Sequence, residues 1–220
     1  MPHFQHRASR IQFVQHGNGQ TLLLIHGAGG NAMNWPPGLR RLPGWSVAAI
    51  DLPGHGKSID APALTSIGEY CALVLAWADA LGVEKFAVAG QSMGAAIALQ
   101  VALDVPERVT HLIPIACAPK IVVNPALLDA LHAGDASAYT TLTRLSYARE
   151  TLPKRLAQYE MHLRNTPPHV LWAAFSACAV FDIADRLGEI AAPTLVIGAV
   201  KDRMIPMQGS IALHNGIAGS

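Results

Sequence analysis

The sequence predicts an α/β fold, in which a mostly parallel β-sheet is flanked by helices and carries a helical cap insertion. Short apolar runs alternate with helical stretches through the first half of the chain, as in a parallel sheet with crossover helices. The alternation stops after residue 118, and strand character returns only near residue 193. We therefore assign residues 1–118 and 186–220 to the core and residues 119–185 to the cap.

Five apolar runs predict the strands of the sheet. Each has the length of a strand and is bounded by Gly, Pro or Asp, as buried parallel strands are. The runs are Leu22–Ile25, Ser46–Ile50, Phe86–Ala89, Val109–Ile115 and Thr194–Ile197. Right-handed crossovers between such strands place their carboxyl ends at one edge of the sheet, where ligands bind in open α/β sheets.

Local signals predict the helices. Ser66 and Glu69 fit a capping box, and the apolar stripe behind them stops at Gly82, a residue typical of helix ends. The stretch from Met93 to Leu103 is Ala-rich and apolar on nearly every side, which indicates a helix buried against the sheet. Four helical stretches fall in the cap: Pro125–His132, Ala136–Tyr147, Pro153–Leu163 and Val170–Phe181.

Composition narrows the class of function. Hydrophobic residues make up 51% and charged residues 14% of the chain, and the net charge is +1, so nothing points to nucleic acid. No apolar stretch reaches membrane-spanning length and no secretory signal is visible, so we expect a cytoplasmic protein without a membrane partner. The histidines and cysteines lack metal-site spacing, so we expect no metal and no cofactor.

The segment Gly90–Gly94 has the pattern G-x-S-x-G, with Ser92 at its centre. It follows the run Phe86–Ala89 and precedes the Ala-rich helix, which is the strand–turn–helix setting of a nucleophilic serine. The glycines permit a turn so tight that the serine takes a positive φ. Its hydroxyl then stands at a helix N-terminus, where free N–H groups favour negative charge. The alternative is a Gly-rich turn with a structural serine, which this setting disfavours.

A second Gly-rich loop, His26–Gly30, follows the first predicted strand. Its backbone N–H groups, together with that of Met93, can form an oxyanion hole beside the serine. The rival interpretation is a phosphate-binding loop. That interpretation fails because the loop matches neither G-x-x-x-x-G-K-[ST] nor a spaced G-x-G-x-x-G.

At these motifs the sequence resembles the α/β-hydrolase superfamily, and most of all its cap-bearing bacterial esterases, lactonases and C–C bond hydrolases. Four blocks match in order: His26-Gly27, Asp51–Ser58, Gly90–Gly94, and Pro193–Gly198 with Asp202 and Pro206 behind it. The resemblance implies a nucleophile, two backbone oxyanion donors and a triad acid, which are Ser92, Ala28, Met93 and Asp202. It also makes Asp51 and His55 turn-forming residues.

The acid and the base of the predicted triad differ in how well the sequence defines them. Asp202 follows the late strand and can orient a histidine, although a loop carboxylate that caps the next helix is the structural alternative. The family's histidine follows one further strand, so we expect either a sequence that is incomplete at its C-terminus or a variant without the usual base. His214 is the only histidine after Asp202 and is therefore the candidate catalytic histidine within this sequence, although its predicted place in a last helical turn favours a simple helix-end cation.

We therefore expect a serine hydrolase that cleaves an ester, a lactone or a related carbonyl substrate through an acyl-enzyme on Ser92. Two alternatives stay open: a catalytically impaired binding protein of this fold, and an acyltransferase or perhydrolase with the same nucleophile. The expected ligand is small and hydrophobic, because Trp172, Phe175 and Phe181 can roof the site. A carboxylate anchor can come from one of five cations, namely Arg144, Arg149, Lys154, Arg155 and Arg164.

Overall fold

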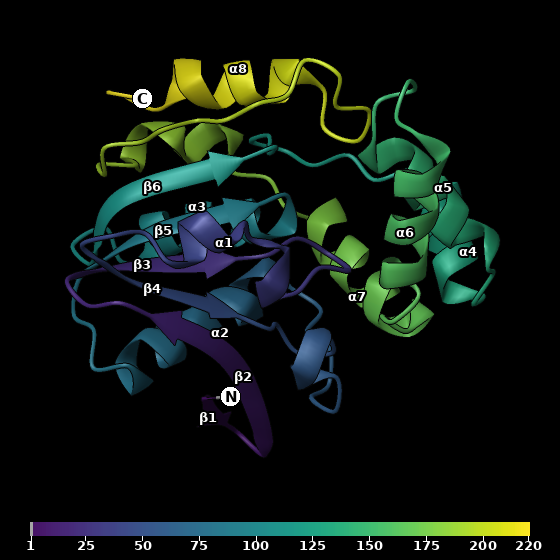
Figure 1. Ribbon diagram of the computed structural model, residues 1–220. Coiled ribbons are helices and arrows are strands. Elements are labelled where there is room, and N and C mark those ends of the chain that lie inside the picture. The colour runs from purple at the N-terminus through teal and green to yellow at the C-terminus, as the bar shows by residue number, and fades with distance from the viewer. Residues whose placement is uncertain (1) are drawn as a thin grey trace.

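A computed structural model describes residues 2–220 and shows a six-stranded sheet with helices against it and a group of helices beyond the carboxyl ends of its strands (Figure 1). The sheet order is β1-β2-β4-β3-β5-β6. Strands β3 to β6 run parallel, and β1 and β2 pair antiparallel. The strands are β1 (His3–His6), β2 (Ser9–His16), β3 (Gln20–Ile25), β4 (Trp45–Ile50), β5 (Phe86–Gln91) and β6 (Val109–Ile115).

The helices divide into those beside the sheet, which we call the core helices, and those within residues 119–185, which we call the cap helices. The core helices are α1 (Pro37–Arg40), α2 (Ile67–Ala80), α3 (Met93–Asp104) and α8 (Met207–Gly216). The cap helices are α4 (Pro125–His132), α5 (Ser137–Ser146), α6 (Pro153–Leu163) and α7 (Pro168–Ala179). Short 3₁₀ helices are η1 (Ala32–Asn34), η2 (Gly56–Ser58) and η3 (Ala184–Glu189). Figure 1 shows α7 between the sheet and α4–α6. No helix within residues 2–220 is long and apolar enough to cross a bilayer.

The last predicted strand forms only in part. The segment 194–197 is extended beside β6, where Leu195 N–H donates to the Leu112 carbonyl at 2.9 Å and Ile197 N–H to the Pro114 carbonyl at 3.0 Å. Two isolated parallel bridges replace a continuous ladder. The reason is Pro114, which has no N–H to donate at the middle of this pairing. The other four predicted strands are confirmed, and β6 has the predicted bounds.

The antiparallel pair of β1 and β2 is an addition that the sequence did not indicate. Ile11 and Phe13 of β2 are buried while the residues between and around them are half-buried or exposed, which is the period of a strand with one covered face. Strand β2 then continues the sheet, because Phe13 pairs with Ile50 of β4. Glutamines and histidines around these few apolar residues conceal the alternation in the sequence.

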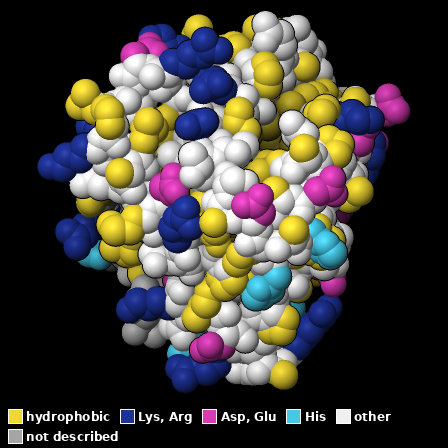
Figure 2. Space-filling view, turned by 90° about the vertical axis from the view of Figure 1, so that its right-hand side faces the viewer, with side chains coloured by type: hydrophobic (Ala, Val, Ile, Leu, Met, Phe, Trp, Pro, Cys, Tyr) yellow, Lys and Arg dark blue, Asp and Glu magenta, His cyan; other side chains and the backbone are white. Residues whose placement is uncertain are grey.

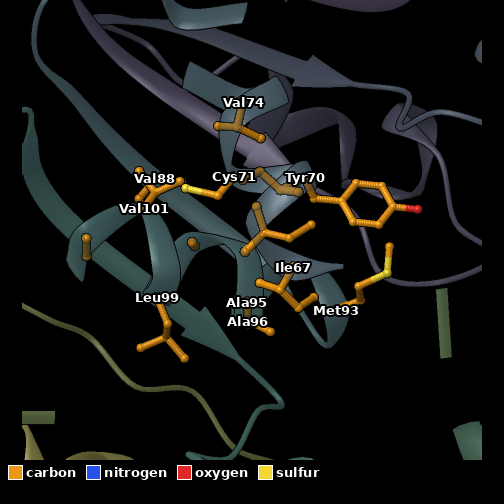
Figure 3. Packing of buried hydrophobic residues seen from close by; sticks show 14 of the residues in the cluster. Ile67, Tyr70, Cys71, Val74, Val88, Met93, Ala95, Ala96, Leu99 and Val101 are labelled. Atoms are coloured by element: carbon orange, nitrogen blue, oxygen red, sulfur yellow. The ribbon is translucent and has the colours of Figure 1, made fainter. Parts of the chain in front are cut away.

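Successive residues of the central strands pack on opposite faces of the sheet. Ile25 and Val88 belong to the large core cluster with α2 and α3, which Figure 3 shows around Val88 and Met93. Leu24 and Ala89 belong to a smaller cluster on the other face. That face also carries a groove of about 580 Å³, lined mainly by apolar residues of β3, β5, β6 and the segment 193–197.

The helix signals in the sequence correspond to real contacts. Ser66 Oγ accepts a hydrogen bond from Glu69 N–H at 3.2 Å, as predicted. The Glu69 carboxylate accepts from Thr65 N–H at 3.1 Å, one residue earlier than a regular capping box requires. Gly82 has a φ of +68° directly after α2, which only glycine adopts without strain. Helix α3 is buried along nearly its whole length, as its composition predicts.

Candidate active site

Ser92 lies at the turn between β5 and α3 in a strained conformation. Its φ is 55° and its ψ is −118°, so the positive φ predicted from the G-x-S-x-G pattern is confirmed. Ser92 N–H donates to the Ile115 carbonyl of β6 at 2.9 Å, which anchors the turn to the sheet. The serine is half-buried and opens onto a cavity.

The two glycines of the pattern are required for close packing. A Cβ atom on Gly90 would overlap the carbonyl group of Gly94, so only glycine lets the first turn of α3 fold back onto β5. A Cβ atom on Gly94 would overlap the carbonyl oxygen of Ile25 at the end of β3. The position of Ser92 is therefore set by backbone contacts with two neighbouring strands.

The loop from His26 to Gly30 packs directly against this turn. A Cβ atom on Gly27 would lie 2.6 Å from the Gln91 side chain and 3.2 Å from Ser92 Cβ, so glycine allows the approach. Ala28 follows, and its N–H donates no hydrogen bond within residues 2–220. Met93 is the first residue of α3, where helix N–H groups have no partner inside the helix. Two N–H groups close to the serine in the chain or in the neighbouring loop are thus without a backbone acceptor in the described residues.

Buried polar side chains hold the loop in place. His26 Nδ1–H donates to the Gly27 carbonyl at 2.7 Å, and its Nε2 accepts from Leu52 N–H at 3.0 Å, so both ring nitrogens are occupied. Burial lowers the pKa of His26 to about 4. The Asp51 carboxylate accepts from Ala32 N–H at 2.7 Å and Lys57 N–H at 2.9 Å. Asp51 therefore joins two neighbouring loops, in keeping with the predicted structural role.

Three cavities meet at Ser92: a small one of about 50 Å³ and two larger chambers. One has a volume of about 250 Å³ and is walled by many polar side chains, whereas the other has about 210 Å³ and is mainly apolar. Ala28 and Ser92 line both. We call them the polar chamber and the apolar chamber. The polar side chains of the first are His26, Asn34, Gln91, Ser92, Ser146, Tyr147, Tyr159, His162 and Asp202. The apolar wall of the second includes Ile121, Val123, Leu127, Leu145, Phe175 and Met204.

The structure brings Asp202 and Ser92 to the same chamber. Asp202 Oδ1 accepts hydrogen bonds from Met204 N–H and Ile205 N–H, each at 2.8 Å. These bonds shape the loop before α8, which is the structural role that the sequence left as an alternative. They occupy one carboxylate oxygen and leave Oδ2 without a hydrogen-bond partner in residues 2–220, so a positioning role for Asp202 stays compatible with the geometry.

The structure does not bring His214 to this site. His214 is exposed in the last turn of α8, where its Nδ1 lies 3.0 Å from Ser220 Oγ, and it is not among the residues that line either chamber. His55 is also outside both chambers, because it is fully buried with Nδ1–H donating to the Pro53 carbonyl at 2.9 Å.

The cap contributes other residues than the sequence suggested. Of the three predicted roof aromatics only Phe175 lines the chambers, since Trp172 stacks on His132 at 5.0 Å and Phe181 belongs to the main core. None of the five candidate cations lines a chamber; Arg164, for example, pairs with Glu160 at 2.7 Å. The missed residues are Ser146, Tyr147, Tyr159 and His162, whose orientation no local signal in the sequence reveals.

The fold and the strained serine turn are those of an α/β hydrolase. The family model for the alpha/beta hydrolase fold matches residues 20–137, which span β3 to α4, and the chain belongs to this family. The matched region contains the predicted nucleophile and both predicted oxyanion donors, while Asp202 lies outside it.

Comparisons with known proteins place hydrolases among its relatives. The chain is 31% identical to a 2-hydroxy-6-oxo-6-phenylhexa-2,4-dienoate hydrolase of Comamonas testosteroni, over 94% of this chain and 80% of that protein. It is 40% identical to a dihydrolipoyllysine-residue acetyltransferase component of an acetoin cleaving system from Cupriavidus necator, over 46% of this chain and only 27% of that protein. The solved structure of Est816, an N-acyl homoserine lactone degrading enzyme, superposes with a TM-score of 0.85 at 26% identity, covering 99% of this chain and 89% of its own.

Proposed function

We propose that this protein hydrolyses an ester, a lactone or a related carbonyl compound through an acyl-enzyme on Ser92. The observation that carries the proposal is the strained turn at Ser92, with the Ala28 N–H free beside it and Met93 at the start of α3. A hydroxyl held at a positive φ, with two N–H groups near it that have no backbone acceptor, fits the attack on a carbonyl carbon. The relatives include hydrolases of carbonyl substrates, which supports the reaction class.

The reaction follows from this geometry. Ser92 Oγ bonds to the carbonyl carbon as its proton passes through water to the free Oδ2 of Asp202, the one carboxylate among the described residues of the polar chamber, while the Ala28 and Met93 N–H groups stabilise the oxyanion. The carbon–leaving group bond then breaks, and the leaving group takes the proton. Water cleaves the acyl-enzyme in the second half and restores the serine. Each oxyanion donor contributes roughly 3–4 kcal/mol of transition-state stabilisation in comparable sites.

One observation favours a second candidate. Within residues 2–220 no imidazole makes a hydrogen bond with Ser92 Oγ or with the Asp202 carboxylate. His26 lines the chamber, but both of its nitrogens are engaged elsewhere. A pocket that binds a carbonyl ligand without turnover is therefore the alternative function. In a serine protease, removal of the histidine alone lowers kcat about 10⁶-fold and leaves roughly 10³–10⁴-fold catalysis over water.

Labelling with a fluorophosphonate tests the proposal. The reagent should modify Ser92, and mass spectrometry should locate it there. Ser146→Ala is a matched control, because Ser146 lines the same chamber and its hydroxyl bonds to Tyr159 at 3.3 Å. We expect Ser92→Ala to abolish the label and Ser146→Ala to keep it. A folded wild-type protein that stays unlabelled while it binds ester ligands would instead support the second candidate.

A further inference from the structure

The polar chamber contains a histidine of the cap whose protonation site the structure defines. Asn31 Oδ1 accepts from Met33 N–H at 2.8 Å, which fixes the orientation of the Asn31 amide. The Asn31 Nδ2 therefore faces His162 Nε2, at 3.2 Å. Because an amide nitrogen only donates, Nε2 is the acceptor of this bond. In the neutral ring the proton is then on Nδ1, which has no partner within residues 2–220.

Other groups in the same chamber add neutral hydrogen-bonding capacity. Tyr159 OH and Ser146 Oγ lie 3.3 Å apart, so one of these hydroxyls donates a hydrogen bond to the other. The hydroxyl that accepts this bond keeps its own hydrogen free for a ligand. Burial raises the pKa of Tyr159, which keeps its phenol neutral. Asn34 Oδ1 accepts from Asn31 N–H, and its amide nitrogen makes no hydrogen bond in the described part of the chain. The chamber wall thus offers several uncharged donors.

The chamber has no fixed positive charge. Among its described lining residues there is no lysine or arginine, and the only formally charged side chain is the Asp202 carboxylate. A ligand carboxylate placed there would lose its hydration without gaining a cation, and Asp202 would repel it. A neutral ether, hydroxyl or carbonyl oxygen meets donors at no such cost. The chemistry of the wall therefore favours uncharged oxygen over a carboxylate.

The apolar chamber fits the opposite part of a substrate. Its wall is mainly aliphatic and aromatic side chains, and its one cation, Arg203, is exposed and held by the Arg144 carbonyl at 2.9 Å. Since Ser92 lines both chambers, a carbonyl at Ser92 has one arm directed into each. The face of the molecule in Figure 2 mixes hydrophobic, acidic and basic side chains, and the basic ones are spread from the top of the view to the bottom.

We propose that His162 selects substrates with an uncharged oxygen-bearing arm opposite an apolar arm, while the Asp202 carboxylate and the absence of a cation in the chamber wall discriminate against a carboxylate in that arm. The proposal rests on the proposed role of Ser92 at the junction of the two chambers. His162 acts here as a specificity-determining residue: its Nδ1–H donates to the substrate oxygen, and Asn31 holds its ring. One such hydrogen bond changes affinity by about 2- to 12-fold.

Three hexanoate esters with alcohol parts of similar length test this assignment: 2-methoxyethyl, butyl and 2-carboxyethyl hexanoate. Their affinities are measured by titration calorimetry with the Ser92→Ala protein, which binds them without cleavage. We expect the 2-methoxyethyl ester to bind about 2- to 12-fold more tightly than the butyl ester, and the 2-carboxyethyl ester to bind most weakly. Because this readout needs no turnover, it is independent of whether Ser92 accepts a fluorophosphonate.

Variants of His162 in the same background give the decisive comparison. His162→Leu should bring the ratio of the 2-methoxyethyl and butyl affinities close to one, and butyl binding should change little. His162→Gln should keep most of the preference, because its amide can still accept from Asn31 and donate to the ligand. Thermal unfolding verifies that each variant is folded. Tightest binding of the 2-carboxyethyl ester, a preference that survives in His162→Leu, or no binding of any ester would overturn the proposal.

Discussion

Two buried histidines should make the stability of this protein sensitive to mild acid. His26 and His55 are 2% and 0% exposed, and their ring centroids lie 5.2 Å apart. Burial lowers the pKa of His26 to about 4, and burial together with the neighbouring His26 lowers that of His55 to about 3. Both have the ordinary pKa of 6.5 in the unfolded chain, so the unfolded state binds protons first as the pH falls. Their contribution to stability is complete above pH 6.5 and is lost as the pH falls toward 4 and 3.

The size of the effect at pH 5 follows from these values. At pH 5 the pH lies 1.5 units below the pKa of 6.5 that each histidine has in the unfolded chain (6.5 minus 5). Each unit of this difference favours the protonated unfolded state by about 1.4 kcal/mol. Each histidine thus lowers the free energy of unfolding by about 2 kcal/mol. The two contributions add to about 4 kcal/mol, because both rings are still neutral in the folded state and do not repel each other. With a urea slope near 2 kcal/mol/M, the midpoint should fall by about 2 M.

Urea unfolding at pH 7 and pH 5, followed by circular dichroism, measures this loss. His55→Asn keeps a donor for the Pro53 carbonyl and cannot take up the proton, so its loss between the two pH values should be about 2 kcal/mol. His16→Asn is the control, since His16 is exposed at the end of β2, and it should behave like the wild type. Ordinary carboxylates protonate mainly below pH 5, which keeps them out of this window.

Two results would refute this reasoning. The first is an unchanged urea midpoint between pH 7 and pH 5, which would mean that the rings accept protons in the folded state at their ordinary pKa. The second is a full loss in His55→Asn, which would assign the acid sensitivity to other groups.

Gly94→Ala should lower the free energy of unfolding by about 3 kcal/mol or more, because its methyl group would overlap the Ile25 carbonyl. Gly68→Ala is the matched control, because Gly68 is exposed on α2 and nothing lies within 4 Å of the added atom. It should raise the free energy of unfolding by up to about 1 kcal/mol. Urea unfolding compares the two variants, and equal effects would contradict the packing argument. His214→Ala should leave the rate of fluorophosphonate labelling within about twofold of wild type, because its ring bonds to Ser220 away from the chambers. A loss of labelling in His214→Ala would mean that His214 does activate Ser92.

The sequence predicts those parts of the protein that local rules decide. Ser92 and its glycines are an example, because a strand, a strained turn and a helix follow one another between Phe86 and Asp104. The predicted helices of the cap also agree closely with the helices of the structure, and α4 and α6 have the predicted bounds. In such segments the periodicity and the terminal residues belong to the element itself.

Features that depend on a distant neighbour were not predictable. The interruption beside β6 arises from Pro114 meeting a segment 80 residues further along the chain. His162 reaches the polar chamber only because α6 packs with one particular face toward the core, and many rotations of an amphipathic helix agree with its sequence. Trp172 and Phe181 are the opposite case, because their helical spacing suggested that they roof the site. Trp172 packs on His132 instead, and Phe181 packs in the main core.

The separate packing of the cap has a consequence for how this protein can change. Leu127, Leu131, Leu142 and their neighbours form a hydrophobic cluster of their own, distinct from the cluster beneath Ser92. Sequence drift in the cap can therefore reshape the walls of both chambers while the turn at Ser92 keeps its backbone supports on β3, β5 and β6. New ligand preferences can arise by exchange of one contiguous stretch of the gene, with the turn at Ser92 inherited unaltered.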